Sequence, residues 1–99
     1  MSVMVIANFQ AAEGKGEALL PLLQEGRDIS RQAEGCEAFD LYQRQDDLHK
    51  FVFVERCASL EAHHANMAKN VVATGHLEKL LPLLRAPIDN GVMRAVCFG

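Results

Sequence analysis

Segments rich in β-branched and aromatic residues alternate along the 99-residue chain with segments whose hydrophobic positions recur every three or four residues. Residues 3–10 and 50–57 are rich in Val, Ile and Phe, which predicts two strands. Residues 36–44 alternate between apolar and polar side chains and predict another strand. Because only a short turn at residues 45–49 separates it from residues 50–57, these two strands are expected to form an antiparallel hairpin.

Helical spacing of hydrophobic positions occurs in three places. Residues 17–33 carry leucines on one face and charges on the other, which predicts a helix that starts near Pro21 or bends there. A short helix is predicted over residues 59–68, with its first residue, a serine, as the N-cap. Residues 71–84 predict a further helical segment, broken at Gly75.

The last strand is predicted over residues 92–98, after a loop at residues 86–91. The order of elements is then β-α-β-β-α-β, the split arrangement of ferredoxin-like domains. The sequence therefore predicts one α+β domain over residues 1–99, in which helices cover one face of a four-stranded antiparallel sheet.

The first predicted strand is apolar on both faces. Val3, Val5 and Phe9 share one face, and Met4 and Ile6 lie on the other. Helices cover only one face of such a sheet, and an uncovered apolar surface of this size is uncommon on a monomer. A second copy of the chain would cover it, so we expect a homodimer.

Composition and charge exclude several partners. The formal net charge is −3, and no run of Lys or Arg exceeds two residues, so we expect no nucleic-acid partner. No stretch approaches the roughly 18 apolar residues of a membrane span, and the N-terminal residues lack the pattern of a signal peptide. Cys36, Cys57 and Cys97 are odd in number and widely spaced. They are expected to be small core residues, reduced in a cytoplasmic protein without membrane partners.

Four short segments carry a family resemblance: Val5-Ile6-Ala7, Glu34-Gly35-Cys36, Phe51-Val52-Phe53-Val54-Glu55-Arg56-Cys57 and Ser59-Leu60-Glu61-Ala62. Over essentially its whole length the chain resembles the antibiotic biosynthesis monooxygenase family, whose members include quinol monooxygenases and small anthrone oxygenases. The resemblance implies a dimeric α+β barrel in which two copies pair sheet to sheet, with a pocket between each sheet and its helices. It also implies cofactor-independent oxygenation of a quinol-like or polycyclic aromatic molecule.

Two positions depart from the pattern of that family. The Glu-Arg-Trp that typically ends the third strand is Glu55-Arg56-Cys57 in this chain. The histidine often found eleven residues after that glutamate is Asn66. Glu55 itself is expected to pair with Arg56, Arg94 or a backbone donor rather than to act as a base.

The implied oxygenation requires only a few features of the protein, because the substrate itself can react with O₂. A deprotonated hydroquinone or anthrone can itself transfer an electron to O₂. The protein must then supply a dry apolar pocket, an acid–base group and a hydrogen-bond donor. The sequence contains neither a metal-binding motif nor a dinucleotide fingerprint, so we expect no cofactor and no metal.

His63, His64 and Asn66 are the predicted catalytic residues. Leu60, His63, His64 and Met67 form one stripe of the predicted helix, so at least one imidazole should face the sheet and act as the general base. In the alternative interpretation, one histidine is solvated and the other is a hydrogen-bonded packing residue. Asn66 is assigned as a donor to the substrate or to a developing oxyanion, although helical spacing leaves its direction open.

Asn8, Tyr42 and His76 are the predicted substrate-binding residues. Asn8 could donate a hydrogen bond to the substrate, or it could bond to the local backbone. Tyr42 could place its phenol in the pocket or at the dimer interface, or serve structure alone. His76 could reach the same cavity or lie at the surface.

Two other functions stay open from the sequence. A non-catalytic module would hold a hydrophobic ligand, haem included, in the same dimeric barrel. Haem-degrading relatives use an asparagine and a histidine near the positions of Asn8 and His76, but they also use a tryptophan, and this chain has none. A structural dimer would instead fill the space beneath the helices with Phe39, Phe53 and Leu77.

Overall fold

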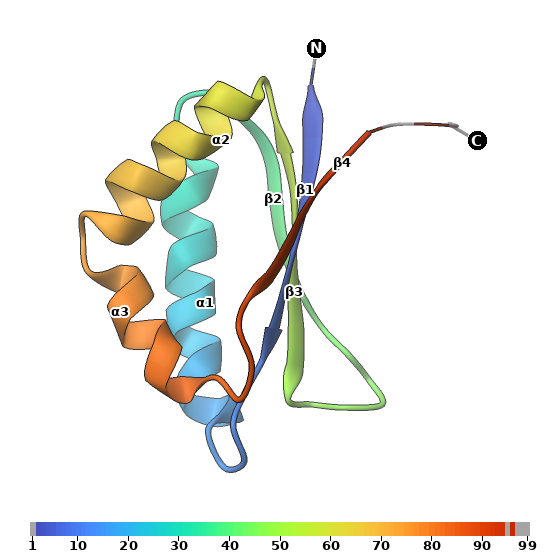
Figure 1. Ribbon diagram of the computed structural model, residues 1–99, viewed down its shortest axis with the longest axis vertical. Coiled ribbons are helices and arrows are strands. Elements are labelled where there is room, and N and C mark those ends of the chain that lie inside the picture. Colours follow the sequence, from blue (N-terminus) through green and yellow to red (C-terminus); the bar gives the residue numbers. More distant parts are fainter. Residues whose placement is uncertain (1, 95, 97–99) are drawn as a thin grey trace.

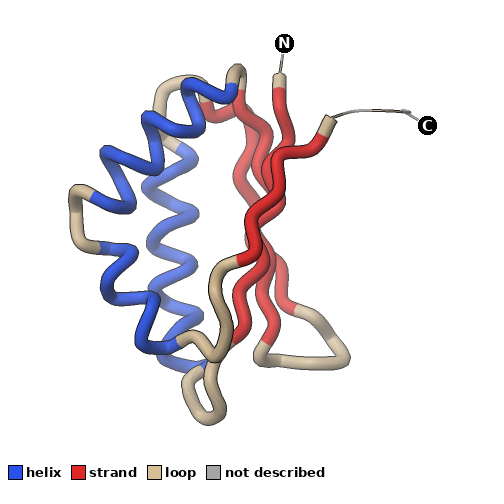
Figure 2. The backbone as a smooth tube through the Cα atoms, in the orientation of Figure 1, coloured by secondary structure: helices blue, strands red, loops and turns tan. Residues whose placement is uncertain are grey.

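The computed structural model describes residues 2–94 and 96, which form a sheet and a layer of helices (Figure 1). The strands are β1 (Val3–Gln10), β2 (Cys36–Gln43), β3 (Lys50–Cys57) and β4 (Asp89–Met93). The helical elements are α1 (Gly16–Arg31), α2 (Leu60–Asn66), the π-helix η1 (Met67–Val72), α3 (His76–Leu80) and the 3₁₀ helix η2 (Leu81–Leu83). All of these helices lie on the same side of the sheet (Figure 2). Among the described residues, no helix has the length and apolar character needed to cross a membrane.

The sheet has the strand order β2-β3-β1-β4, with every neighbouring pair antiparallel. The central strand β1 pairs with β3 and β4, so that Val5 lies opposite both Glu55 and Val92. The hairpin of β2 and β3 forms as predicted. This topology confirms the predicted α+β class and the ferredoxin-like order of elements.

The hydrophobic core lies between the sheet and the helices. Leu19 and Leu23 of α1 are fully buried against the inner face of the sheet. At the centre of that face, the ring of Phe53 makes edge contacts with Phe9 and Phe39, at centroid distances of 5.1 and 4.7 Å. Such edge-to-face pairs are the favoured aromatic geometry, and they fix the rings that border the space beneath the helices.

The outer face of the sheet carries apolar side chains that no helix covers. Met4, Ile6, Val52 and Val54 are half-buried on this face, and the ring of Tyr42 beside them is 57% exposed. Figure 1 shows this face free of helices. The two-sided apolar character predicted for the strands is therefore present, and in the single chain one side of it faces solvent.

Two helical predictions need correction. Helix α1 begins at Gly16 and continues through Pro21, so the expected start near this proline was wrong. Proline removes one backbone donor from the helix, but Leu19 and Leu23 on either side are anchored in the core and hold the segment helical. The predicted helix over residues 59–68 extends to Val72, because η1 follows α2 without interruption.

The last strand also differs from its prediction. Strand β4 begins at Asp89, inside the expected loop over residues 86–91. Its polar first residues lack a strand pattern, but pairing with the free edge of β1 sets the backbone there, with Asp89 opposite Asn8. The predicted end of this strand, together with Cys97, lies outside the described residues.

Candidate active site

A cavity of about 290 Å³ lies between the inner face of the sheet and the helices. Its walls are mostly apolar: the sheet contributes Phe9, Phe39 and Phe53, and the helical layer contributes Met67 and Leu80. Polar side chains reach the cavity at a few points only. This combination of apolar walls and few polar groups is typical of small-molecule sites.

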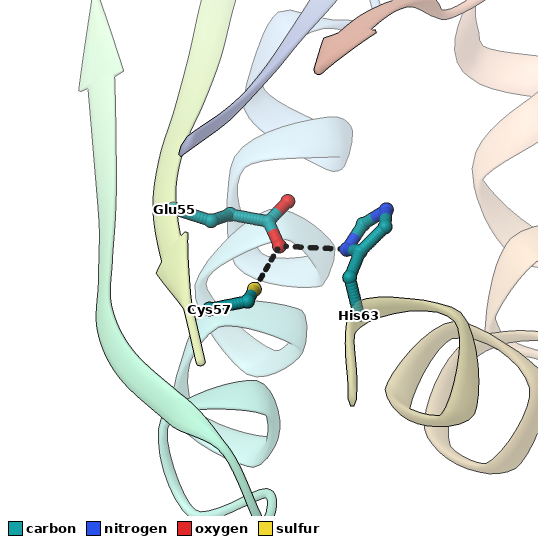
Figure 3. Close-up of side chains that lie close together, drawn as sticks. All are labelled: Glu55, Cys57 and His63. Carbon is teal, nitrogen blue, oxygen red and sulfur yellow. Dashed lines mark hydrogen bonds and ion pairs between the residues drawn. The ribbon is translucent and has the colours of Figure 1, made fainter. Parts of the chain in front are cut away.

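Glu55 and His63 form a polar pair on the wall of this cavity (Figure 3). The side chain of Glu55 projects from β3 toward the helices, and the residue is only 2% exposed. Its Oε1 lies 3.2 Å from Nδ1 of His63, which is carried by α2. A buried carboxylate is costly unless it is hydrogen-bonded, so this contact is what makes Glu55 tolerable in the core.

The tautomer of the imidazole follows from the protonation of Glu55. An ionised carboxylate only accepts hydrogen bonds, so beside ionised Glu55 the Nδ1 of His63 donates and carries the proton. Nε2 of the neutral ring then keeps a free lone pair, and Figure 3 shows this second nitrogen on the side of the ring turned away from Glu55. An imidazole held in this way can accept a proton from a ligand in the cavity.

Cys57 is the third residue of this cluster. Its Sγ lies 3.9 Å from Oε1 of Glu55 and donates a weak hydrogen bond to it. Burial of the thiol and the negative charge of Glu55 raise the pKa of Cys57 to about 11, so the thiol is neutral at physiological pH. The donor atoms of Glu55, Cys57 and His63 lie within 4.8 Å of one another, close enough to hold a metal ion.

Local structure explains why these side chains meet. Side chains alternate along β3, so Glu55 and Cys57 lie on the same inner face as Phe53. The chain then turns back over the end of the sheet, and Oγ of Ser59 caps α2 by accepting a hydrogen bond from the backbone N–H of Ala62 at 3.1 Å. His63 follows four residues after this cap, in the last turn of α2, and is thereby directed toward β3.

His76 is the second imidazole of the cavity and is 5% exposed. It begins α3, directly after Gly75, whose φ of +77° makes the turn between η1 and α3. Its ring lies against Gly26 of α1, where a Cβ would meet Nε2 at 3.1 Å. Within the described part of the chain, the hydrogen bond found for His76 is made by its backbone N–H, to Oγ1 of Thr74. No fully buried side-chain nitrogen or oxygen there lacks a partner, so the ring nitrogens of His76 reach the cavity and are available to a ligand.

Two of the six predicted site residues, His63 and His76, line the cavity. His64 is exposed on the outside of α2. Asn66 is buried but lines a different hollow, between α1 and α2. Its amide is already engaged: Nδ2 donates to Oγ of Ser30, and Oδ1 accepts from Nδ2 of Asn70.

The remaining two predicted residues lie on the other side of the sheet. Asn8 is exposed on the outer face of β1, opposite Asp89. Tyr42 is exposed on β2 and borders a shallow hollow with Arg27 and Asp40. Neither side chain borders the cavity, because strand alternation turns both away from the helices.

Sequence reasoning missed Glu55 as a site residue. The expectation that it pairs with Arg56, Arg94 or a backbone donor was wrong, because its partner is His63. Arg56 is exposed on the opposite face of β3. The signal that could have found Glu55 is its spacing of two residues from Phe53, which places both side chains on the core face of one strand.

Comparisons with known proteins agree with this architecture. The sequence profile of the antibiotic biosynthesis monooxygenase family matches residues 2–85. A search of curated proteins found no significant match. Among solved structures, the chain is similar to Rv0793 from Mycobacterium tuberculosis, with 26% sequence identity and a TM-score of 0.88 over 99% of this chain and 98% of that chain.

Two further structures are similar along nearly their full lengths. One is described as an antibiotic biosynthesis monooxygenase and shares 28% identity, with a TM-score of 0.81 over 96% of this chain and 99% of that chain. The other, a proposed antibiotic biosynthesis monooxygenase from Nitrosomonas europaea, shares 18% identity, with a TM-score of 0.88 over 96% of this chain and 90% of that chain. Because the family profile spans most of the sequence, the chain belongs to the antibiotic biosynthesis monooxygenase family.

Proposed function

We propose that this protein is a cofactor-independent monooxygenase that acts on a quinol-like aromatic molecule. The observation that carries the proposal is the Glu55–His63 pair, a carboxylate that orients an imidazole on the wall of an apolar cavity. Membership of the antibiotic biosynthesis monooxygenase family supports the same class of reaction.

The size of the cavity narrows the substrate. A volume of about 290 Å³ is at the lower end of the ~300–1,000 Å³ typical of small-molecule pockets. Aromatic walls formed by Phe9, Phe39 and Phe53 suit a flat ring system. We therefore expect a quinol-like substrate of a few fused rings at most, rather than a molecule as large as haem.

His63 acts as the general base in this proposal. Its Nε2 removes the proton of a phenol or enol, and Glu55 stabilises the resulting imidazolium through Nδ1. The substrate anion then transfers one electron to O₂, and the two radicals combine to form a carbon–oxygen bond. The resulting peroxide anion takes back the proton held by His63 and becomes a hydroperoxide. Loss of water from the hydroperoxide leaves a carbonyl, so one oxygen atom enters the product and the other leaves as water.

His76 orients the substrate. Its free ring nitrogens lie on the same cavity as His63, and Asn90 of β4 adds an amide to that wall. A donor placed at the substrate oxygen stabilises the anion that deprotonation produces. The two imidazoles thus have different tasks: His63 removes the proton, and His76 holds the oxygen from which it came.

We also propose a homodimer in which two outer sheet faces pack together, in a cytoplasm that keeps Cys36 and Cys57 reduced. The support for the dimer is the exposed apolar outer face around Ile6 and Val54. Light scattering at micromolar concentration should give the mass of two chains. Val54→Glu should give a monomer, whereas Val72→Glu, on the helical side, should not; a monomeric wild-type protein would contradict the dimer.

The activity is tested by oxygen uptake with a panel of reduced quinones and anthrones. His63→Ala should lower the rate about 10²–10⁴-fold, the usual effect of losing a general base. His64→Ala is the matched control, because it removes an exposed imidazole from the same helix and should leave the rate unchanged. Ligand binding without oxygen uptake in the wild-type protein would instead identify a non-catalytic binding module.

A further inference from the structure

The cluster of Glu55, Cys57 and His63 has the composition of a metal site. Among residues 2–94 and 96, these are the only three His, Cys, Asp or Glu side chains whose donor atoms all lie within 4.8 Å of one another. A buried thiol sulfur, an imidazole nitrogen and a carboxylate oxygen are a donor set typical of zinc. Cys57 gives the orienting carboxylate only a weak hydrogen bond, and no step of the proposed oxygenation uses the thiol.

We propose that Glu55, Cys57 and His63 bind a Zn²⁺-like divalent cation that switches the oxygenase off. The ligand atoms are Oε1 of Glu55, Sγ of Cys57 and Nδ1 of His63, which already point toward one another (Figure 3). On binding, the thiol proton and the Nδ1 proton are displaced to solvent or to Nε2, and no electron transfer is involved.

The distances suit a tetrahedral ion. Around zinc, ligand atoms bound at ~2.0–2.3 Å stand about 3.3–3.5 Å apart. The oxygen of Glu55 and the nitrogen of His63 are separated by 3.2 Å, and the sulfur of Cys57 lies 3.9 Å from that oxygen. The sulfur and the nitrogen of His63 lie within 4.8 Å of each other, so the Cys57 side chain must move toward the other two ligands for all three to bind one ion.

Three protein ligands leave one position of a tetrahedral ion open. Glu55 and His63 line the apolar cavity and Cys57 does not, so the cation would lie at the margin of the cavity. The carboxylate and the thiolate together balance its double charge. An ion so placed is held inside the protein and also adjoins the position of the substrate.

The inhibitory effect follows from the tautomer of His63, and it rests on the proposed function. A neutral imidazole has one lone pair on nitrogen. In the metal-free protein Glu55 keeps the proton on Nδ1, and the lone pair of Nε2 is free. A cation bound to Nδ1 forces the proton onto Nε2, so His63 becomes a donor and can no longer act as a base.

Binding is tested without reference to activity, by titrating the untagged, reduced protein with Zn²⁺ and with Co²⁺. We expect one ion per chain, with the Co²⁺ absorption bands of tetrahedral thiolate coordination. Cys57→Ser should weaken binding at least about tenfold, whereas Cys36→Ser should not, although Cys36 lies directly opposite on β2. If the wild-type protein does not bind Zn²⁺ or Co²⁺ saturably, or if its Co²⁺ complex lacks the thiolate band, the proposed site is wrong. This result needs no variant, so it holds even if Cys57→Ser misfolds.

Inhibition is tested by oxygen uptake in the presence of stoichiometric Zn²⁺. The rate of the wild-type protein should fall at least tenfold and recover on chelation, and Cys57→Ser should resist the same concentration. Full activity of the metal-loaded protein would overturn the switch. No oxygen uptake in the metal-free protein would contradict the proposed function, while the Co²⁺ spectrum would still decide the metal site.

Discussion

The imidazole of His76 lies in the space that a Cβ on residue 26 would enter, with Nε2 3.1 Å from that position. Gly26 is in the middle of α1, where glycine costs about 0.5–1 kcal/mol relative to alanine. We infer that the helix accepts this cost because the missing side chain lets His76 approach and border the cavity.

Gly26→Ala is therefore expected to displace the ring of His76 by a few tenths of an ångström. The gain in helix propensity offsets the contact, so the free energy of unfolding should change by less than about 1 kcal/mol. Oxygen uptake should fall about tenfold, since misplaced substrate contacts are costly for catalysis. Gly16→Ala, at the start of the same helix, meets only ordinary contacts and should keep full activity. Wild-type uptake by Gly26→Ala would contradict the positioning role.

The N-cap residue Ser59 stabilises α2, the helix that carries the proposed base His63. Ser59→Ala removes the side-chain acceptor of the Ala62 N–H and should lower the free energy of unfolding by about 0.5–2 kcal/mol. Ser59→Asp retains an acceptor and should stay close to the wild-type value, as measured by urea denaturation. Equal losses in the two variants would show that the cap does not stabilise this helix.

Phe53 connects the rings of Phe9 and Phe39 and is 8% exposed. Phe53→Ala should lower the free energy of unfolding by about 3–5 kcal/mol, because it removes buried area and enlarges the cavity. Leu48→Ala is the control, since this side chain is 62% exposed in the hairpin turn and its loss should cost less than about 0.5 kcal/mol. A similar loss in both variants would contradict the central position of Phe53.

Asp47 should make stability depend on acid pH. The backbone N–H of His49, at 3.0 Å, and the nearby charge of Arg85 lower the pKa of this carboxyl in the folded protein. A lowered pKa stabilises the fold at pH values above about 4, the unfolded value, and this contribution is lost as the pH falls through the folded pKa. Between pH 5 and 3 the wild-type melting temperature should fall more than that of Asp47→Asn, and parallel curves would contradict this role.

The sequence predicts the fold well where hydrophobic patterns are strong. The hairpin of β2 and β3 and the extent of β1 match their predictions, because Val, Ile and Phe mark those segments. Strand β4 begins in polar residues, and its start is set by pairing with β1 rather than by its own composition. The hydrophobic spacing also predicted the extent of α1, and only the alternative start near Pro21 was wrong, because burial of the neighbouring leucines outweighs the local preference of proline.

The site was less predictable than the fold. Helical spacing placed His63 and His64 on one stripe, and the way α2 packs against β3 decides that His63 meets Glu55 and His64 faces outward. Asn66 belongs to the helix interface, where Ser30 and Asn70 already bond its amide. Such partners come from elements distant in sequence, so residue type and spacing alone did not show them.

The central position of β1 has a consequence for how the chain matures. Its partners are β3 and β4, so β1 is synthesised before both of the strands with which it pairs, as Val3 does with Cys57 and Val5 with Val92. Contacts between residues so distant in sequence slow folding, and apolar strands that remain unpaired are prone to aggregate. The nascent chain must therefore keep β1 from self-association until β3 and β4 have both been synthesised.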